Sequence, residues 1–122
     1  MAAWTEEEIS EANKEDLYIS APNEDGTEHA PTWIWMVVVD GELYCRSYNG
    51  QSGSWYTAVK RTGNGHAKFG SVNRAVAFEF INDENVNAAI DDAYKIKYAG
   101  SPYLDGPLSE TMRSATVKLV PK

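Results

Sequence analysis

Apolar and polar residues alternate along several short stretches of the chain, and this period-two pattern predicts β-strands. The longest apolar stretch, WIWMVVV at 33–39, is rich in aromatic and β-branched residues and predicts a strand buried on both faces. Asp40-Gly41 supplies the two positive-φ residues of a tight hairpin turn, so residues 42–48 are predicted to return as the partner strand. Four further strands are predicted at 16–20, 66–70, 74–81 and 115–120.

Apolar residues at three- and four-residue spacing predict helices in other parts of the chain. Thr5 and Glu8 form a capping box that begins a first helix at 6–13. A longer helix is predicted at 83–98, a short one at 55–60 with Ser54 as its cap, and a single turn at 109–113. The polar stretch 21–32, with prolines and Asp-Gly, predicts a loop. With no repeat or linker, we expect one α+β domain over 1–122 built on an antiparallel sheet.

The tight turn fixes a register for the hairpin, in which Met36 faces Cys45, Trp35 faces Arg46, Ile34 faces Ser47 and Trp33 faces Tyr48. One face is then almost entirely apolar and should lie inside the sheet or barrel: Ile34, Met36, Val38, Leu43, Cys45 and Ser47. The other face carries aromatic rings and one cation: Trp33, Trp35, Val37, Tyr44, Arg46 and Tyr48. A helix of the same chain, a second subunit or a planar ligand would each cover these rings.

Arg46 has two interpretations in this register. In the first, it packs on buried aromatic rings, with Trp35 as its cation–π partner, and forms an ion pair with an acid. In the second, its guanidinium binds the phosphate or carboxylate of a ligand. The sequence favours the first interpretation and leaves the second open.

Composition excludes several classes of protein. An apolar fraction of 43% and an aromatic fraction of 11% indicate a packed core. The net charge of −7, without a local cluster of basic residues, disfavours nucleic-acid binding. The longest apolar run is far shorter than the roughly 20 residues of a membrane-spanning helix. We therefore expect a protein that contacts neither nucleic acid nor membrane and resides in the cytoplasm.

Residues with catalytic or metal-binding chemistry do not form a recognisable site. His29 and His66 are the only histidines and their spacing resembles no metal site. The sequence around Ser47, Ser52 and Ser54 lacks the Gly-x-Ser-x-Gly elbow, which makes a hydrolase a distant possibility. Cys45 is the only cysteine, which excludes an internal disulfide and, by the register, predicts a buried, unreactive thiol. No catalytic residue is predicted.

Two polar segments near the long helix are interpreted structurally. Asp91 and Asp92 with Lys95 predict a solvated helix face stabilised by an i,i+4 ion pair. Lys97 and Tyr98 follow the apolar stripe of the helix and are predicted to anchor its end.

Several segments together resemble a bacterial family of uncharacterised proteins, domain of unknown function 2255. They are DLYIS, DGT, WIWMVVVDGELYCRS, GQSGSWY, IDDAYKIKY and ATVKLVP, which span nearly the whole chain. Cys45 stands where that family commonly has valine, in keeping with a packing role. The family in turn resembles the flavin-binding split β-barrels, the fold of pyridoxamine-phosphate oxidase and of deazaflavin-dependent nitroreductases.

This resemblance implies an antiparallel six-stranded split β-barrel with peripheral helices, assembled as a homodimer. It also implies a flavin, either FMN or a deazaflavin, at the subunit interface, with its phosphate bound by basic and hydroxyl side chains. On this chain Arg46 and Ser47 would contact the phosphate, and Arg113 would supply a second cation. Aromatic residues would line the apolar wall of the site: Trp33, Trp35, Tyr48 and Trp55. The usual set of phosphate-binding cations is incomplete, since only Lys60, Arg61 and Arg74 can be added loosely.

Two functions follow from these observations. The first is a homodimer that binds a flavin-like or other planar anionic ligand at its interface, where any redox chemistry, as in a flavin- or deazaflavin-dependent oxidoreductase, is supplied by the cofactor. The second is a cofactor-free structural or interaction dimer, whose aromatic face is only the subunit interface.

Overall fold

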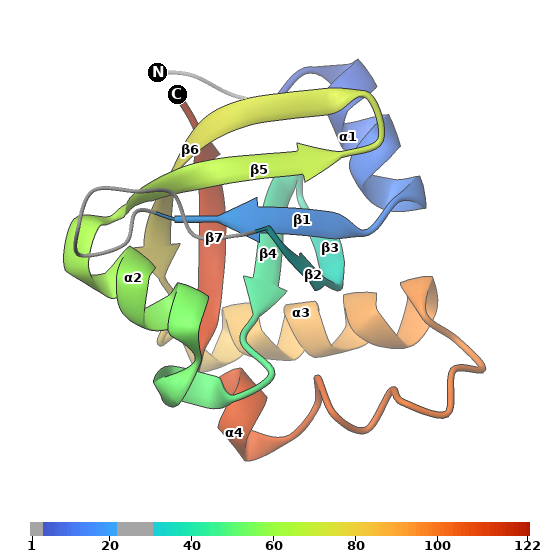
Figure 1. Ribbon diagram of the computed structural model, residues 1–122. Coiled ribbons are helices and arrows are strands. Elements are labelled where there is room, and N and C mark those ends of the chain that lie inside the picture. Colours follow the sequence, from blue (N-terminus) through green and yellow to red (C-terminus); the bar gives the residue numbers. More distant parts are fainter. Residues whose placement is uncertain (1–3, 22–30) are drawn as a thin grey trace.

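The computed structural model describes residues 4–21 and 31–122 (Figure 1). Seven strands form one antiparallel sheet in the order β2-β1-β5-β6-β7-β4-β3. The strands are β1 (Leu17–Ser20), β2 (Thr32–Ile34), β3 (Met36–Val39), β4 (Glu42–Arg46), β5 (Asn64–Phe69), β6 (Val72–Phe80) and β7 (Thr116–Pro121). The helices are α1 (Glu6–Lys14), η1 (Gly50–Ser52), α2 (Ser54–Thr62), α3 (Glu84–Lys97) and α4 (Glu110–Arg113). Pro22, Asp25-Gly26 and His29 lie outside the described residues.

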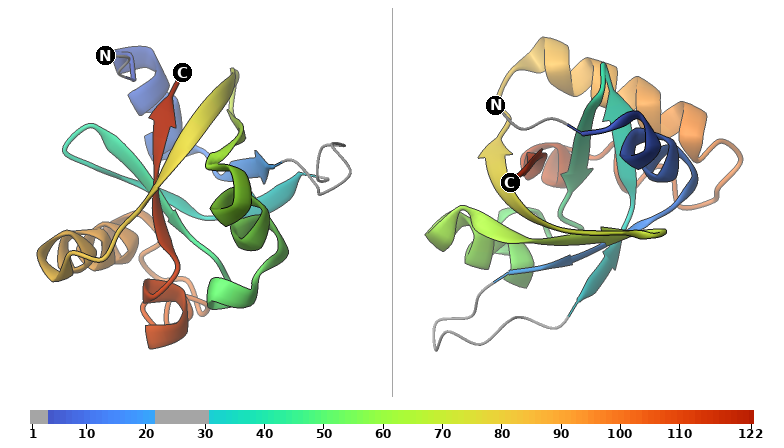
Figure 2. Two further views of the ribbon diagram at one scale, coloured as in Figure 1. Left: turned by 90° about the vertical axis from the view of Figure 1, so that its left-hand side faces the viewer. Right: turned by 90° about the horizontal axis from the view of Figure 1, so that it is seen from above.

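The predicted α+β class with an antiparallel barrel is confirmed, with seven strands in place of six. The extra strand arises because the apolar stretch 33–39 is divided at Trp35 between β2 and β3. β2 pairs with β1, whereas β3 pairs with β4, so the two edge strands of the sheet are consecutive in the chain. The sheet therefore curves round on itself into a nearly closed barrel (Figure 2).

The hairpin register is confirmed for β3, where Met36 pairs with Cys45 and Val39 with Glu42. Asp40 and Gly41 have φ values of 50° and 78°, as the predicted tight turn requires. The predicted pairing of residues 33–35 with residues 46–48 is wrong, because Trp33 pairs with Tyr18 of β1 instead. The bend that closes the barrel takes these residues away from β4.

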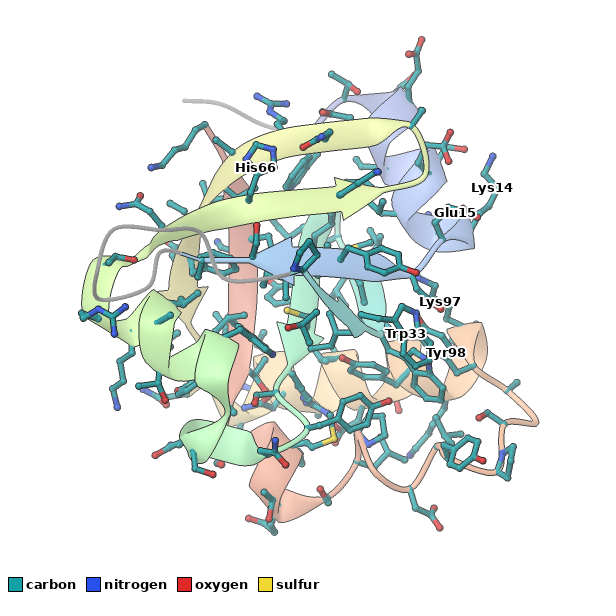
Figure 3. The ribbon with its side chains drawn as sticks, viewed as in Figure 1. Lys14, Glu15, Trp33, His66, Lys97 and Tyr98 are labelled. Carbon is teal, nitrogen blue, oxygen red and sulfur yellow. The ribbon has the colours of Figure 1, made fainter. Side chains whose placement is uncertain are left out.

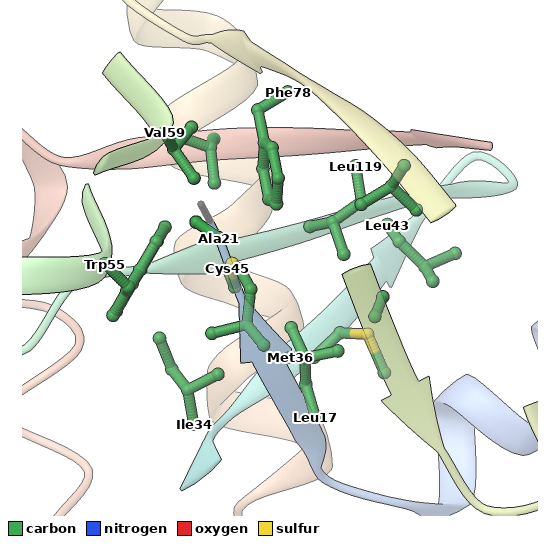
Figure 4. Close-up of a cluster of buried hydrophobic side chains, with 14 of the residues drawn as sticks. Leu17, Ala21, Ile34, Met36, Leu43, Cys45, Trp55, Val59, Phe78 and Leu119 are labelled. Carbon is green, nitrogen blue, oxygen red and sulfur yellow. The ribbon is translucent and has the colours of Figure 1, made fainter. Parts of the chain in front are cut away.

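The barrel interior is filled by side chains from every strand and from the helices (Figure 4). The strands contribute Leu17, Ile19, Ile34, Met36, Leu43, Cys45, Ala67, Phe69, Val76, Phe78, Val117 and Leu119. Helix α2 adds Trp55, Tyr56, Ala58 and Val59, helix α1 adds Ala12, and the segments outside these elements add Trp4, Ala21 and Ala115. The apolar face predicted from the hairpin register is thus the interior of the barrel.

Helix α3 covers the outer face of β3 and β4 (Figures 1 and 2). Ile90 and Tyr94 of the helix pack against Trp35, Val37 and Tyr44, all of which are buried. A helix of the same chain therefore covers Trp35 and Tyr44, whereas Trp33 and Tyr48 of the predicted aromatic face remain about half exposed. Within the described part of the chain, no helix is long and apolar enough to span a membrane.

Local signals account for most helix ends. The capping box of α1 is confirmed, with the Thr5 side chain accepting from the Glu8 amide and the Glu8 side chain accepting from the Thr5 amide. Ser54 is not the cap of α2, because Gly53 holds the N-cap position and the helix begins at Ser54. The helix ends at Gly63, whose φ of 73° suits glycine.

Candidate functional site

Arg46 ends β4 with its side chain fully buried, and all five of its N–H donors have partners within the chain. Nε donates to Thr116 Oγ1 at 3.0 Å. Nη1 donates to Asp91 Oδ1 at 2.6 Å and to the Pro107 carbonyl at 2.8 Å. Nη2 donates to the carbonyl and Oδ1 of Asn87 at 3.2 and 3.0 Å. In this arrangement the guanidinium has no donor left for an external anion.

The ring beside Arg46 is Tyr94 of α3, whose centroid lies 5.4 Å from the guanidinium carbon. The predicted cation–π partner, Trp35, is therefore wrong, because α3 places its own tyrosine over this part of the strand. Arg46 is thus a buried cation packed on a ring and paired to an acid, and its remaining N–H groups bind Thr116, Pro107 and Asn87.

Arg113 lies close to Arg46, but the two cations meet around a carboxylate of the chain itself. Arg113 Nε is 3.1 Å from Asp91 Oδ2, and its Nη2 donates to Glu84 Oε1 at 2.7 Å. Asp91 therefore bridges two arginines and does not pair with Lys95 as predicted; Lys95 Nζ lies 4.0 Å from Asp92. A buried arginine requires a counter-charge, and Asp91 is the residue of α3 that supplies it.

The other predicted ligand contacts are mostly buried. Ser47 is buried against Gly53, where an added Cβ would collide with the serine hydroxyl. Trp55 packs in the barrel core beside Phe78. Trp35 is covered by Tyr98, with ring centroids 3.9 Å apart and planes within 6° of parallel.

Tyr48 differs from these residues, because 45% of its surface is exposed. Partial burial raises the pKa of Tyr48, and the nearby Asp16 carboxylate raises it further. Asp16 is a residue that sequence reasoning did not select.

Asp16, between α1 and β1, accepts hydrogen bonds from two aromatic side chains from distant parts of the chain. Its Oδ2 accepts from Trp33 Nε1 at 3.0 Å, and its Oδ1 accepts from the Tyr98 hydroxyl at 2.7 Å. Tyr98 is the C-cap of α3. No local spacing connects these three residues, so only the closed barrel brings them together.

Lys97 anchors the end of α3 beside this cluster (Figure 3). Its Nζ donates to the carbonyls of Ala12 and Glu15 at 2.8 Å each and to that of Met36 at 2.6 Å. Burial lowers the pKa of Lys97 to about 8, against the opposing charges of Asp16 and Glu15. These contacts hold the end of α3 against the barrel, as predicted for Lys97 and Tyr98.

An uncovered aromatic surface lies on the outer face of β2, β1 and β5. Tyr18 pairs with Trp33 on one side and with Lys68 on the other, so the three side chains stand in a row. Trp33 is 50% exposed and Tyr18 is 47% exposed. Both residues line a surface groove of about 280 Å³. Its lining residues are Lys14, Glu15, Asp16, Tyr18, Trp33 and Gly70. Helix α3 lies on the opposite side of the barrel from β5 (Figure 2).

The topology and the placement of the helices define a split β-barrel, in which the two edge strands of one curved sheet follow each other in the chain. Residues 7–119 match the family described as uncharacterized protein conserved in bacteria, DUF2255. The chain belongs to this family. No curated protein sequence matches it.

Solved structures of the same fold share little sequence with the chain. A conserved hypothetical protein from Mycobacterium tuberculosis has a TM-score of 0.72 and 16% identity, covering 98% of this chain and 82% of its own. The heme storage protein HutZ from Vibrio cholerae has a TM-score of 0.68 and 11% identity, covering 96% of this chain and 89% of its own. A FAD-binding protein from Mesorhizobium loti has a TM-score of 0.60 and 10% identity, covering 98% of this chain and 91% of its own. At these identities the similarity shows the fold alone.

Proposed function

We propose that this protein is a homodimeric split barrel that binds a planar ring ligand, such as a flavin, at the outer face of β1, β2 and β5. The observation that carries the proposal is the pair of half-exposed aromatic side chains, Tyr18 and Trp33, on a face that no described helix covers. Soluble monomers rarely leave such rings adjacent and open to water. A partner subunit, a planar ligand or both would cover them.

Two other parts of the barrel are already filled or covered by the chain itself. The interior is packed with the side chains of the main cluster, and the outer face of β3 and β4 lies beneath α3. A larger groove, of about 540 Å³, has Glu7, Glu8 and Glu11 and no aromatic residue in its lining, so the face of β1, β2 and β5 suits a planar ring ligand better. Trp33 and Tyr48 are the two members of the predicted aromatic wall that remain about half exposed.

The ligand class is supported by the chemistry of proteins with the same fold. The neighbours described as a heme storage protein and a FAD-binding protein are named for large, planar, conjugated ligands. Exposed tryptophan and tyrosine rings suit such ligands, because offset stacking buries both apolar faces. If the ligand is FMN or a deazaflavin, the cofactor supplies redox chemistry and the protein supplies binding and orientation.

The assembly is tested by sedimentation velocity on the purified chain, with two variants that reverse one exposed charge. Lys68 lies beside Tyr18 on the outer face, and Lys60 lies on α2; neither has an ion-pair partner within residues 4–21 and 31–122. We expect a dimer that Lys68→Glu weakens and Lys60→Glu leaves intact. A chain that is monomeric throughout would contradict the dimer.

Ligand binding is tested by thermal-shift titration of the same protein with FMN, a deazaflavin and hemin. We expect at least one to raise the unfolding midpoint, since a ligand that binds only the folded state stabilises it. A stable dimer whose midpoint responds to none of these compounds would instead be the cofactor-free interaction dimer.

A further inference from the structure

We infer that Trp33 is the stacking surface of the ligand site and that the site recognises the ring system of its ligand and not a phosphate group. This inference rests on the proposed function and deepens it by naming the recognising residue and the chemical feature recognised. It departs from what the resemblance implies, namely a flavin bound through its phosphate by Arg46, Ser47 and Arg113.

The indole of Trp33 is fixed at one edge, while about half of the residue is exposed to solvent. Its only donor, Nε1–H, is bound to Asp16 Oδ2 at 3.0 Å, yet half of the side-chain surface remains exposed. The other tryptophans, Trp4, Trp35 and Trp55, are at most 8% exposed. Trp33 is thus the tryptophan whose ring a ligand in solution can contact.

Asp16 is itself immobilised, so Trp33 is held by a chain of contacts that reaches α3. The second carboxylate oxygen accepts from the Tyr98 hydroxyl at 2.7 Å. The Tyr98 hydroxyl also accepts from the Met36 amide at 3.2 Å, and its ring stacks on Trp35. A ring fixed before binding loses little conformational entropy when a planar ligand stacks on it.

The charges nearby do not form a phosphate site. In the groove Lys14 stands beside Glu15, and the carboxylate of Asp16 is bound by Trp33 and Tyr98. Lys68 is exposed on the neighbouring strand, where a flexible side chain in water contributes little to affinity. The two arginines that would bind phosphate, Arg46 and Arg113, are both bound to acids of α3. Stacking of the ligand ring on Trp33 is therefore the main source of recognition.

The test is a titration of the full chain with riboflavin and with FMN, which share a ring system and differ by one phosphate. Flavin fluorescence gives the two dissociation constants, at about 50 and about 300 mM salt. We expect constants within about threefold of each other and a weak salt dependence, because no fixed cation contacts the phosphate. Bound flavin should also protect Trp33 from quenching by iodide.

Variants identify the ring involved. Trp33→Leu should weaken the binding of both flavins about tenfold or more, whereas Trp33→Phe, which keeps a ring, should retain most of the affinity. Tyr103→Leu is the matched control, because Tyr103 is 73% exposed and does not line the groove. Its affinity should equal that of the wild type.

The outcomes separate the inference from the proposed function. If the wild-type protein binds none of riboflavin, FMN, a deazaflavin and hemin, the proposed function fails and the stacking site fails with it. If the wild type binds flavin and a folded Trp33→Leu variant binds it equally well, the stacking site is wrong and the proposed function stands. If FMN binds more than about tenfold tighter than riboflavin, and salt removes the difference, recognition of the ring alone is wrong.

Discussion

Arg46 and Asp91 join β4 to α3 through a 2.6 Å ion pair whose arginine has no exposed surface. The same carboxylate also binds Arg113 of α4. Three segments distant in sequence are thereby connected at one acid. Through these contacts Arg46 holds α3 on the barrel. Its role is therefore in the stability of the fold and not in ligand affinity.

Arg46→Met should destabilise the protein by about 3–5 kcal/mol, because the change leaves Asp91 and Asn87 without their buried partner. Urea unfolding followed by circular dichroism measures this loss. Arg113→Met is the matched control and should cost about 1 kcal/mol or less, since Arg113 is partly exposed. Equal stability of Arg46→Met and wild type would contradict the structural role, and loss of flavin binding by folded Arg46→Met would restore a ligand role.

The hydrogen bond between Asp16 and Tyr98 should give a coupling free energy of about 1–2 kcal/mol in a double-mutant cycle of Asp16→Asn and Tyr98→Phe. The unfolding free energies of the four proteins measure it. As a control, Tyr98→Phe should be additive with Asp83→Ala, since Asp83 caps the opposite end of α3. Additivity of the Asp16 pair would mean that Trp33 is not held through this contact.

Stability should depend on pH through Lys97, whose pKa is lowered by burial from 10.5 to about 8. Lys97 therefore loses its proton at a lower pH in the folded state than in the unfolded state. Between pH values of about 8 and 10.5, the unfolded state binds more protons than the folded state. The contribution of Lys97 to the free energy of unfolding therefore increases with pH across this range. The difference in unfolding free energy, wild type minus Lys97→Met, should grow from about pH 7 to about pH 9.5.

The exposed Ile96, which carries no titratable group, provides the control for this pH dependence. The difference between wild type and Ile96→Ala should stay constant over the same range, because both proteins carry the same titrating groups. A constant or falling difference for Lys97→Met would contradict the lowered pKa.

The thiol of Cys45 should react with a disulfide reagent such as DTNB only when the protein unfolds. Cys45 is fully buried in the barrel, and burial raises the pKa of its thiol. The labelling rate should therefore rise with urea along with the unfolded fraction. Cys45→Val should change stability by less than about 1.5 kcal/mol. Fast labelling of the native protein would show that the barrel opens locally at β4.

The sequence predicted the elements whose signals are local. The capping box at Thr5, the turn at Asp40-Gly41 and the register of Met36 with Cys45 depend on residues close together in the chain, and all three are confirmed. The division at Trp35 was missed, because an unbroken apolar run does not show that its two halves pair with different strands.

The candidate site was harder to predict, because exposure depends on tertiary packing. The register placed Trp35 and Arg46 on the outer face correctly, but it could not show that α3 lies on that face. The same alternation gave no reason to prefer Trp33, which stays open because the barrel bends before α3 can reach it. Asp16 carried no signal, since its partners are Trp33 and Tyr98, far away in sequence.

The contacts of Lys97 and Tyr98 with Met36 also bear on aggregation. β3 is an edge strand, and its first residue has both its N–H and its C=O bound by side chains of α3. A strand from another molecule cannot form hydrogen bonds with those groups, so extension of the sheet from this edge is blocked at its start. At this end of β3, two copies that associate will therefore meet through side-chain surfaces and not through added strand hydrogen bonds.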